Sequence, residues 1–233
     1  MTNKLVDSNL KIKHLTADGS FFPYMKNSLT NKTINIWIDT LGESKIWNLY
    51  PPSEVFNVNA QKMPQFRVDF IKEMLTKLDD ILDVKFNYVD NKQDANLTIM
   101  QHYEPVDGYS YGGTVSFMKT NEIMDYELVI TTYAEEPLST NWWKYALLHE
   151  LGHALHLEHP FDNEDNDIFG NESYPTPDYS VMSYGQPLNG VFPDWYHTID
   201  IQALKTIWGI GATENNDSIF GLSGTDIINA LGG

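Results

Sequence analysis

Cysteine is absent from this sequence of 233 residues. The absence excludes disulfides, thiolate metal sites and cysteine nucleophiles. Positive charge is scarce as well, because 15 lysine and arginine residues stand against 32 acidic residues and leave a formal net charge of −17. A surface this acidic argues against nucleic acid and anionic membranes as partners.

Long apolar segments are also missing. The N-terminal stretch MTNKLVDSNLKIKHLTADGS lacks the apolar run of a secretory signal peptide, and no later stretch is long and apolar enough to span a bilayer. The chain is nevertheless long enough to bury a substantial core as one domain. We therefore expect a monomeric domain that does not bind membranes.

The most informative segment is HELGHALHLEHP, which runs from His149 to Pro160. His149 and His153 are four residues apart, so on an α-helix both side chains lie on one face and can bind one metal ion. Glu150 lies beside the first ligand, where its carboxylate can accept a proton from a water on the metal. This pattern is typical of zinc hydrolases.

His159 would complete a catalytic zinc site with three protein ligands and an open position. An uninterrupted helix would place it roughly 15 Å along the axis from His149, on another face. The helix must therefore break between His153 and His159, and Pro160 favours such a break. His156 is a competing ligand, but we expect it to be the turning residue, in the left-handed conformation that histidine tolerates better than most residues.

Hydrophobic periodicity predicts an α+β fold. Apolar residues from Phe66 to Leu82 recur at helical spacing, and a second helix carrying the histidine pair is expected from about Asn141. The asparagine- and proline-rich segment Phe161–Ser180 should be mostly loop, and a final helix, Asp200–Trp208, should follow it. Alternating patterns predict strands at residues 33–38, 84–89, 95–100, 114–118 and 127–132.

A second motif, SVMSYG, covers residues 180–185 and lies downstream of the third histidine. Metzincin peptidases carry a methionine-containing turn beneath their three histidines, the place that Met182 would take here. HELGHALHLEHP, SVMSYG, the segment DIQALKTIWG and a faint nonapeptide repeat at residues 217–228 occur in the expected order. Together they make the chain resemble a serralysin-type metzincin.

The resemblance implies a zinc endopeptidase with protein or peptide substrates. Zinc would be held by the three histidines, and Glu150 would activate the attacking water. Tyr184 would be a fifth, movable zinc ligand that stabilises the oxyanion. An edge strand at Thr114–Met118 would pair with the extended substrate, although no residue is assigned to substrate binding. Asp200 is a candidate for a carboxylate that supports the zinc helix.

The resemblance also implies a zincin catalytic domain at residues 31–210. We expect an upper half, up to about residue 159, with two long helices above the cleft on a twisted, mixed sheet with antiparallel edges. The lower half, 160–210, should be irregular and end in a helix. Residues 1–30 would be an N-terminal extension or an inhibitory propeptide, and 211–233 a tail related to calcium-binding repeats. Secretion without an N-terminal signal peptide to an extracellular location, and Ca²⁺ as a second metal, follow from the same resemblance.

Two alternatives remain open. Glu172 lies at a distance from His153 that suits the third ligand of a thermolysin-like site, although Pro175 and Pro177 disfavour the helix that such a ligand needs. The acidic segment Asp162–Asp167 and the tail repeat favour a non-catalytic calcium-dependent module or pseudo-protease. The family motif expects glycine where this chain has His156, which puts the local backbone in question.

Overall fold

The architecture is taken from a computed structural model. It describes residues 9–16, 29–43, 45–47, 57–102, 112–120, 123–131, 141–163, 166–172 and 174–211. The tail repeat and most of the N-terminal extension therefore lie outside the described residues.

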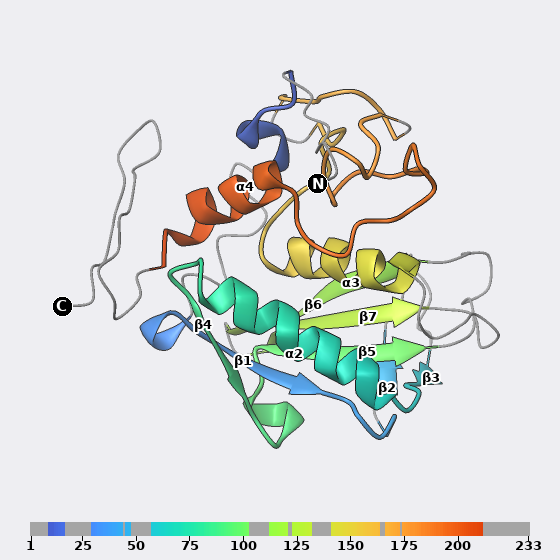
Figure 1. Ribbon diagram of the computed structural model, residues 1–233. Coiled ribbons are helices and arrows are strands. Elements are labelled where there is room, and N and C mark those ends of the chain that lie inside the picture. Colours follow the sequence, from blue (N-terminus) through green and yellow to red (C-terminus); the bar gives the residue numbers. More distant parts are fainter. Residues whose placement is uncertain are drawn as a thin grey trace.

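Five strands form one mixed sheet in the order β4-β1-β5-β7-β6 (Figure 1). Three of its four pairings are parallel, and the edge strand β6 alone runs antiparallel to its neighbour β7. The central strand β5 is buried along its whole length, as expected for a strand with neighbours on both sides. The strands are β1 (Thr33–Ile38), β4 (Lys85–Tyr88), β5 (Leu97–His102), β6 (Gly112–Thr120) and β7 (Ile123–Thr131).

All five strands overlap the segments predicted from alternation. The position of β6 at the sheet edge agrees with the expectation for 114–118. A separate antiparallel pair, β2 (Lys45–Trp47) and β3 (Asn57–Asn59), was not anticipated. Three-residue strands are too short for their alternation to stand out from the surrounding sequence.

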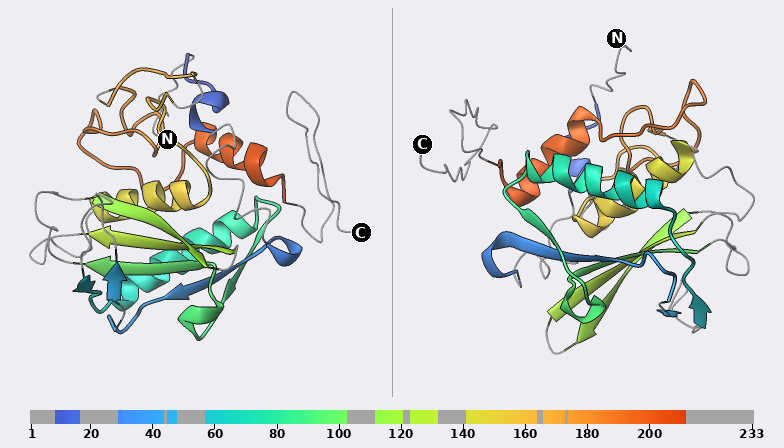
Figure 2. Two further views of the ribbon diagram at one scale, coloured as in Figure 1. Left: turned by 180° about the vertical axis from the view of Figure 1, so that it is seen from behind. Right: turned by 60° about the horizontal axis from the view of Figure 1, so that its bottom comes forward.

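Two long helices, α2 (Gln65–Asp79) and α3 (Asn141–Ala154), lie on the same face of the sheet (Figure 2). Helix α2 presents one buried stripe, formed by Val68, Ile71, Leu75 and Leu78. Helix α3 is buried on nearly all sides, because the sheet covers one face and the chain after residue 154 covers the other. The two expected long helices are confirmed. The expected antiparallel edge is found on one side of the sheet only, at β6, because the other edge strand, β4, runs parallel to β1.

The predicted lower half, hereafter the lower part, is drawn at the top of Figure 1. It contains helix α4 (Thr198–Trp208) and the irregular chain between α3 and α4. Isolated one-residue bridges are the only strand pairing among the described residues between these helices. The predicted loop character of this segment is confirmed. At the start of the described chain, the 3₁₀ turn η1 (Ile12–Leu15) packs beside α4, and a second 3₁₀ turn, η2 (Thr30–Lys32), leads into β1.

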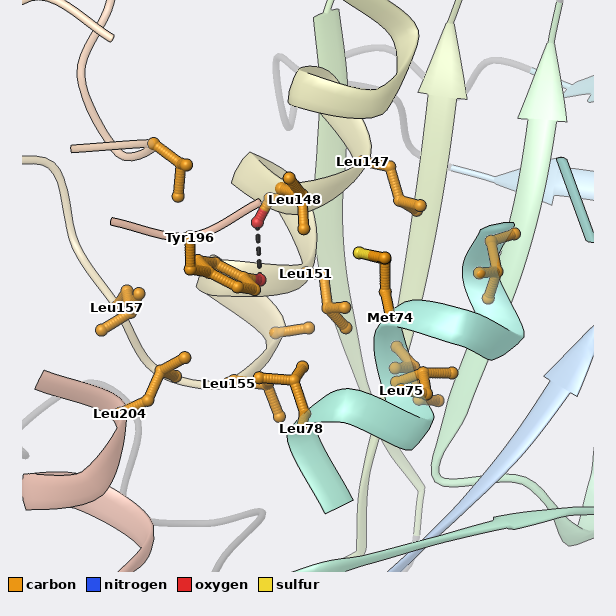
Figure 3. Close-up of a cluster of buried hydrophobic side chains, with 14 of the residues drawn as sticks. Met74, Leu75, Leu78, Leu147, Leu148, Leu151, Leu155, Leu157, Tyr196 and Leu204 are labelled. Carbon is orange, nitrogen blue, oxygen red and sulfur yellow. Dashed lines mark hydrogen bonds between the residues drawn. The ribbon is translucent and has the colours of Figure 1, made fainter. Parts of the chain in front are cut away.

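The core joins these parts into one unit (Figure 3). Leucines from α2 and α3 meet Leu155, Leu157 and Leu204 from the lower part, and each is essentially inaccessible to water. Burying a leucine side chain stabilises a fold by about 1.5–3 kcal/mol, so these contacts hold the lower part against α3. The Tyr196 hydroxyl adds a hydrogen bond of 2.8 Å to the carbonyl of Leu148. No helix among the described residues has the length and apolar character needed to cross a membrane.

Candidate metal site

The helix that carries the first two histidines ends in a tight turn. The Leu157 amide donates to the Gly152 carbonyl at 2.9 Å, and the His156 amide donates to the His153 carbonyl at 2.9 Å. This pair of bonds is the Schellman motif, in which the residue after the helix takes the left-handed conformation. His156 is that residue, with φ 76°. The predicted helix break and the predicted role of His156 are both confirmed.

His156 occupies this position with a buried side chain rather than as a solvent-exposed substitute for glycine. Its ring packs 5.6 Å from the ring of Trp208 in α4, and it is 5% exposed. The Trp208 indole N–H also donates to the carbonyl of Leu155 at 2.9 Å. Helix α4 therefore packs against the turn through Trp208, and these contacts offset the steric cost of a Cβ atom in the left-handed region.

The turn brings the third histidine back to the first two. The Nε2 atom of His149 lies 3.2 Å from both other Nε2 atoms, and those of His153 and His159 are 3.0 Å apart. Two nitrogen ligands of a tetrahedral zinc ion, at about 2.0–2.1 Å from the metal, would lie about 3.3 Å apart. Among the described residues these three histidines form the one cluster of side chains suited to a metal ion.

The other nitrogen of each ring shows why the three Nε2 atoms converge. Nδ1 of His149 lies 2.8 Å from the Val181 carbonyl, and that of His153 lies 2.8 Å from the Leu157 carbonyl. Nδ1 of His159 lies 2.9 Å from a carboxylate oxygen of Asp162. Carbonyl and carboxylate oxygens only accept, so each Nδ1 must donate and each Nε2 presents a lone pair. Three lone pairs at these distances repel one another unless a cation lies between them, so the residues fit a metal ion.

The electrostatics also keep the rings of His149 and His153 neutral. Burial and the neighbouring histidine rings lower the pKa of His149 well below its usual value and lower that of His153 to about 3. Neutral imidazole is the form that binds metal, so protons compete weakly for these two ligands at neutral pH.

The SVMSYG segment packs directly against the histidine helix. The Val181 carbonyl binds His149, as described above, and Met182 is fully buried. A Cβ atom at Gly152 would lie 2.5 Å from the Met182 sulfur, so glycine is what permits this close approach. The segment thus contacts the helix at His149 and Gly152.

Asp200 holds this segment from α4. Its buried carboxylate accepts hydrogen bonds from the Ser180 hydroxyl at 2.6 Å and from the amides of Val181 and His197 at 3.2 and 2.8 Å. Burial raises the pKa of Asp200, and the charge of His197 and these hydrogen bonds oppose that rise. The support expected from Asp200 therefore reaches the histidine helix through the Val181 backbone rather than through a direct contact.

Tyr184 lies against two of the three histidine rings, and the Glu150 carboxylate is close enough to affect its pKa. The Tyr184 ring stacks on His149 at 5.5 Å and meets the His159 ring edge-on at 4.6 Å. Burial raises the pKa of Tyr184 to about 12, and the nearby Glu150 carboxylate adds to the rise. The phenol therefore keeps its proton at neutral pH and can donate a hydrogen bond. Glu150 is 7% exposed.

Asp162 is the site residue that sequence reasoning missed. The sequence pattern places it in an acidic, calcium-type segment, yet its carboxylate accepts from both the ring and the amide of His159. Its spacing of three residues from His159 was the available signal. Burial alone would raise the pKa of Asp162, but the hydrogen bonds from His159 outweigh that effect and lower it.

The thermolysin-like alternative loses its structural basis. Glu172 is exposed, lies in irregular chain and is absent from the metal-type cluster. Two other histidines also lie outside the cluster. Nδ1 of His102 is 3.2 Å from the carbonyl of Asn59, and Nε2 of His197 is 2.7 Å from the carbonyl of Pro177.

Comparison with known proteins gives distant relatives that are named serralysins and a metalloprotease. The chain is 26% identical to serralysin of Photorhabdus laumondii over 164 residues, which is 63% of this chain and 34% of that protein. It is 34% identical to serralysin C of Dickeya chrysanthemi over 103 residues, 39% of this chain and 22% of the relative. A metalloprotease, AprA, of Pseudomonas entomophila is 32% identical over 103 residues, 37% of this chain and 21% of the relative.

The chain thus spans about a third or less of the length of these curated relatives. No family model matches it. The similarities and the histidine cluster support a relation to the metalloproteases.

Proposed function

We propose that this protein is a zinc-dependent endopeptidase of the serralysin type. The observation that carries the proposal is the convergence of three Nε2 lone pairs, each oriented by a hydrogen bond at Nδ1. Three neutral imidazoles with an open fourth position are typical of catalytic rather than structural zinc sites. The names of the relatives, serralysin and metalloprotease, point to the same chemistry.

Zinc, when bound, lowers the pKa of a coordinated water towards neutrality and polarises the peptide carbonyl. Glu150 accepts the proton of the attacking water and returns it to the leaving amine. The Tyr184 phenol donates a hydrogen bond to the developing oxyanion, which it can do because it stays protonated. Met182 packs against Gly152 of the histidine helix and helps to keep the helix in place.

Strand β6 is the proposed binding edge for the substrate. It pairs with β7 on one side only within the described sheet, so its outer edge offers backbone donors and acceptors to an extended peptide. The same proposal includes a catalytic domain at residues 31–210 and calcium binding by the tail. It also includes action as a monomer and an extracellular location.

Zinc analysis combined with casein hydrolysis tests this function. The wild-type chain should contain one zinc per molecule and hydrolyse casein, and a chelator should abolish the activity. Glu150→Gln should retain zinc but lower the rate by about 10²–10⁴-fold, because it removes the proton acceptor without changing the size of the side chain. Glu172→Gln is the matched control and should retain both properties. Activity that survives both the chelator and Glu150→Gln would refute the proposal.

A further inference from the structure

The short N-terminal segment Ile12–Thr16 lies against the loop that carries the third histidine. In Figures 1 and 2 its turn η1 lies beside α4, near the irregular chain between α3 and α4. Leu15 is completely buried in the main core, and His14 is 7% exposed. The segment is therefore anchored in the folded part of the chain through Leu15 and His14.

This segment contacts the chain immediately before His159. Thr16 forms an antiparallel bridge with Leu157, and the Glu158 amide donates to the Leu15 carbonyl at 3.2 Å. Leu157 also supplies the carbonyl that orients the ring of His153. The N-terminal segment therefore holds two residues that lie between the helix turn and the third histidine.

The same segment is linked, through Phe169, to the residue that follows His159. The ring of His14 stacks on Phe169 at 5.1 Å with an interplanar angle of 15°. The Phe169 amide in turn donates to the carbonyl of Pro160 at 2.6 Å. The backbone on both sides of the third histidine is thus tied to one short N-terminal turn.

We propose that Ile12–Thr16 is a positioning element of the metal site, which holds His159 in place from both sides through Leu15 and His14. Loss of this support makes the loop that carries His159 less ordered and so weakens metal binding. It follows that these residues support the proposed catalytic domain from outside its expected boundary at residue 31, and that they do not belong to a removable inhibitory segment. The inference rests on the proposed zinc site and goes beyond it by adding a distant segment to that site.

Three variants of the full chain test the idea. His14→Ala removes both the stacking on Phe169 and the Nδ1 acceptor of the Lys11 amide, which lies 2.9 Å away. His14→Phe loses only that acceptor and keeps an aromatic ring against Phe169. Lys13→Ala, the control, removes an exposed side chain whose ammonium lies 3.9 Å from the carboxylate of Asp167. Zinc affinity is measured by competition with a chromophoric chelator. We expect about tenfold weaker binding for His14→Ala, the lower end of the range for residues that orient ligands, and changes within about twofold for the other two.

Hydrogen exchange of the metal-free proteins separates a local effect from general destabilisation. The peptide that covers Leu157–His159 should exchange faster in His14→Ala. The Glu158 amide donates to the Leu15 carbonyl, and a less ordered N-terminal segment holds that carbonyl in place less well. The peptide of α2 should be unchanged. Cobalt substitution adds a spectroscopic check, since the visible absorption of Co²⁺ should differ from wild type in His14→Ala and recover in His14→Phe.

Each outcome has one meaning. Unchanged zinc affinity in His14→Ala would overturn the inference and leave the proposed zinc site intact. Weaker binding that His14→Phe does not restore, or faster exchange in α2 as well, would also overturn it. A wild-type chain that binds no zinc would instead refute the proposed function.

Discussion

Asp162 offers a sharp test of how the site binds its metal. One oxygen of its carboxylate accepts from the ring Nδ1 of His159 at 2.9 Å and from the backbone amide of the same residue at 3.2 Å. The hydrogen bonds from His159 lower the pKa of Asp162 despite its burial, so the group is charged at neutral pH. Asp162→Asn removes that charge but keeps the size and one acceptor oxygen.

The expected magnitude follows from the exposure of the side chain and from what asparagine retains. Loss of a residue that orients a metal ligand weakens metal binding by about 10–100-fold. The Asp162 side chain is 36% exposed, so solvent screens part of its charge, and the amide oxygen of the substituted asparagine can still accept from His159. We therefore expect about tenfold for Asp162→Asn, or about 1.4 kcal/mol, and about 100-fold for Asp162→Ala.

Competition with a chromophoric chelator at neutral pH measures both variants. Asp167→Asn is the matched control, because this carboxylate lies in the same irregular chain but faces Lys13. Its zinc affinity should equal that of the wild type. Equal affinities for wild type and Asp162→Asn, or the same loss in Asp167→Asn, would refute the orienting role of the Asp162 charge.

Two further predictions concern Tyr184 and His156. Tyr184→Phe should lower kcat by about 10²-fold with little change in KM. Since burial raises the pKa of Tyr184 to about 12, the ratio of wild-type to variant rates should stay constant from neutral pH to about pH 10; a ratio that falls within this range would contradict the donor role. His156→Gly should change the free energy of unfolding by less than about 1 kcal/mol, because relief of the left-handed backbone offsets the lost contact with Trp208. His156→Val should cost about 2 kcal/mol in chemical denaturation, and equal losses for both variants would show that the backbone is not the cause.

The central part of the site could be predicted because it is local in sequence. The spacing of His149 and His153 places both rings on one helical face, and a histidine six residues further on can join them only across a turn. His156 was the residue available for that turn, and its φ of 76° confirms it. Helices, and the strands of the main sheet, also follow from short periodic patterns.

The partners of the histidines could not be predicted in the same way. Val181 and Leu157 bind through carbonyl groups, which every residue has, so no side-chain pattern marks them. Asp162 has a side chain of the right type, but acidic residues in loops are usually solvated. Its role becomes visible only when the loop brings its carboxylate to His159.

The sequence by itself determined which three imidazoles can share a metal, where their helix ends and which residue makes the turn, because these depend on contacts within a few residues. Only the tertiary structure decided the order and direction of the strands, the position of Met182 against Gly152 and the place of the N-terminal turn beside Leu157 and Glu158. The reason is physical: such contacts join segments far apart in the chain, and they depend on how whole surfaces pack rather than on any local periodicity.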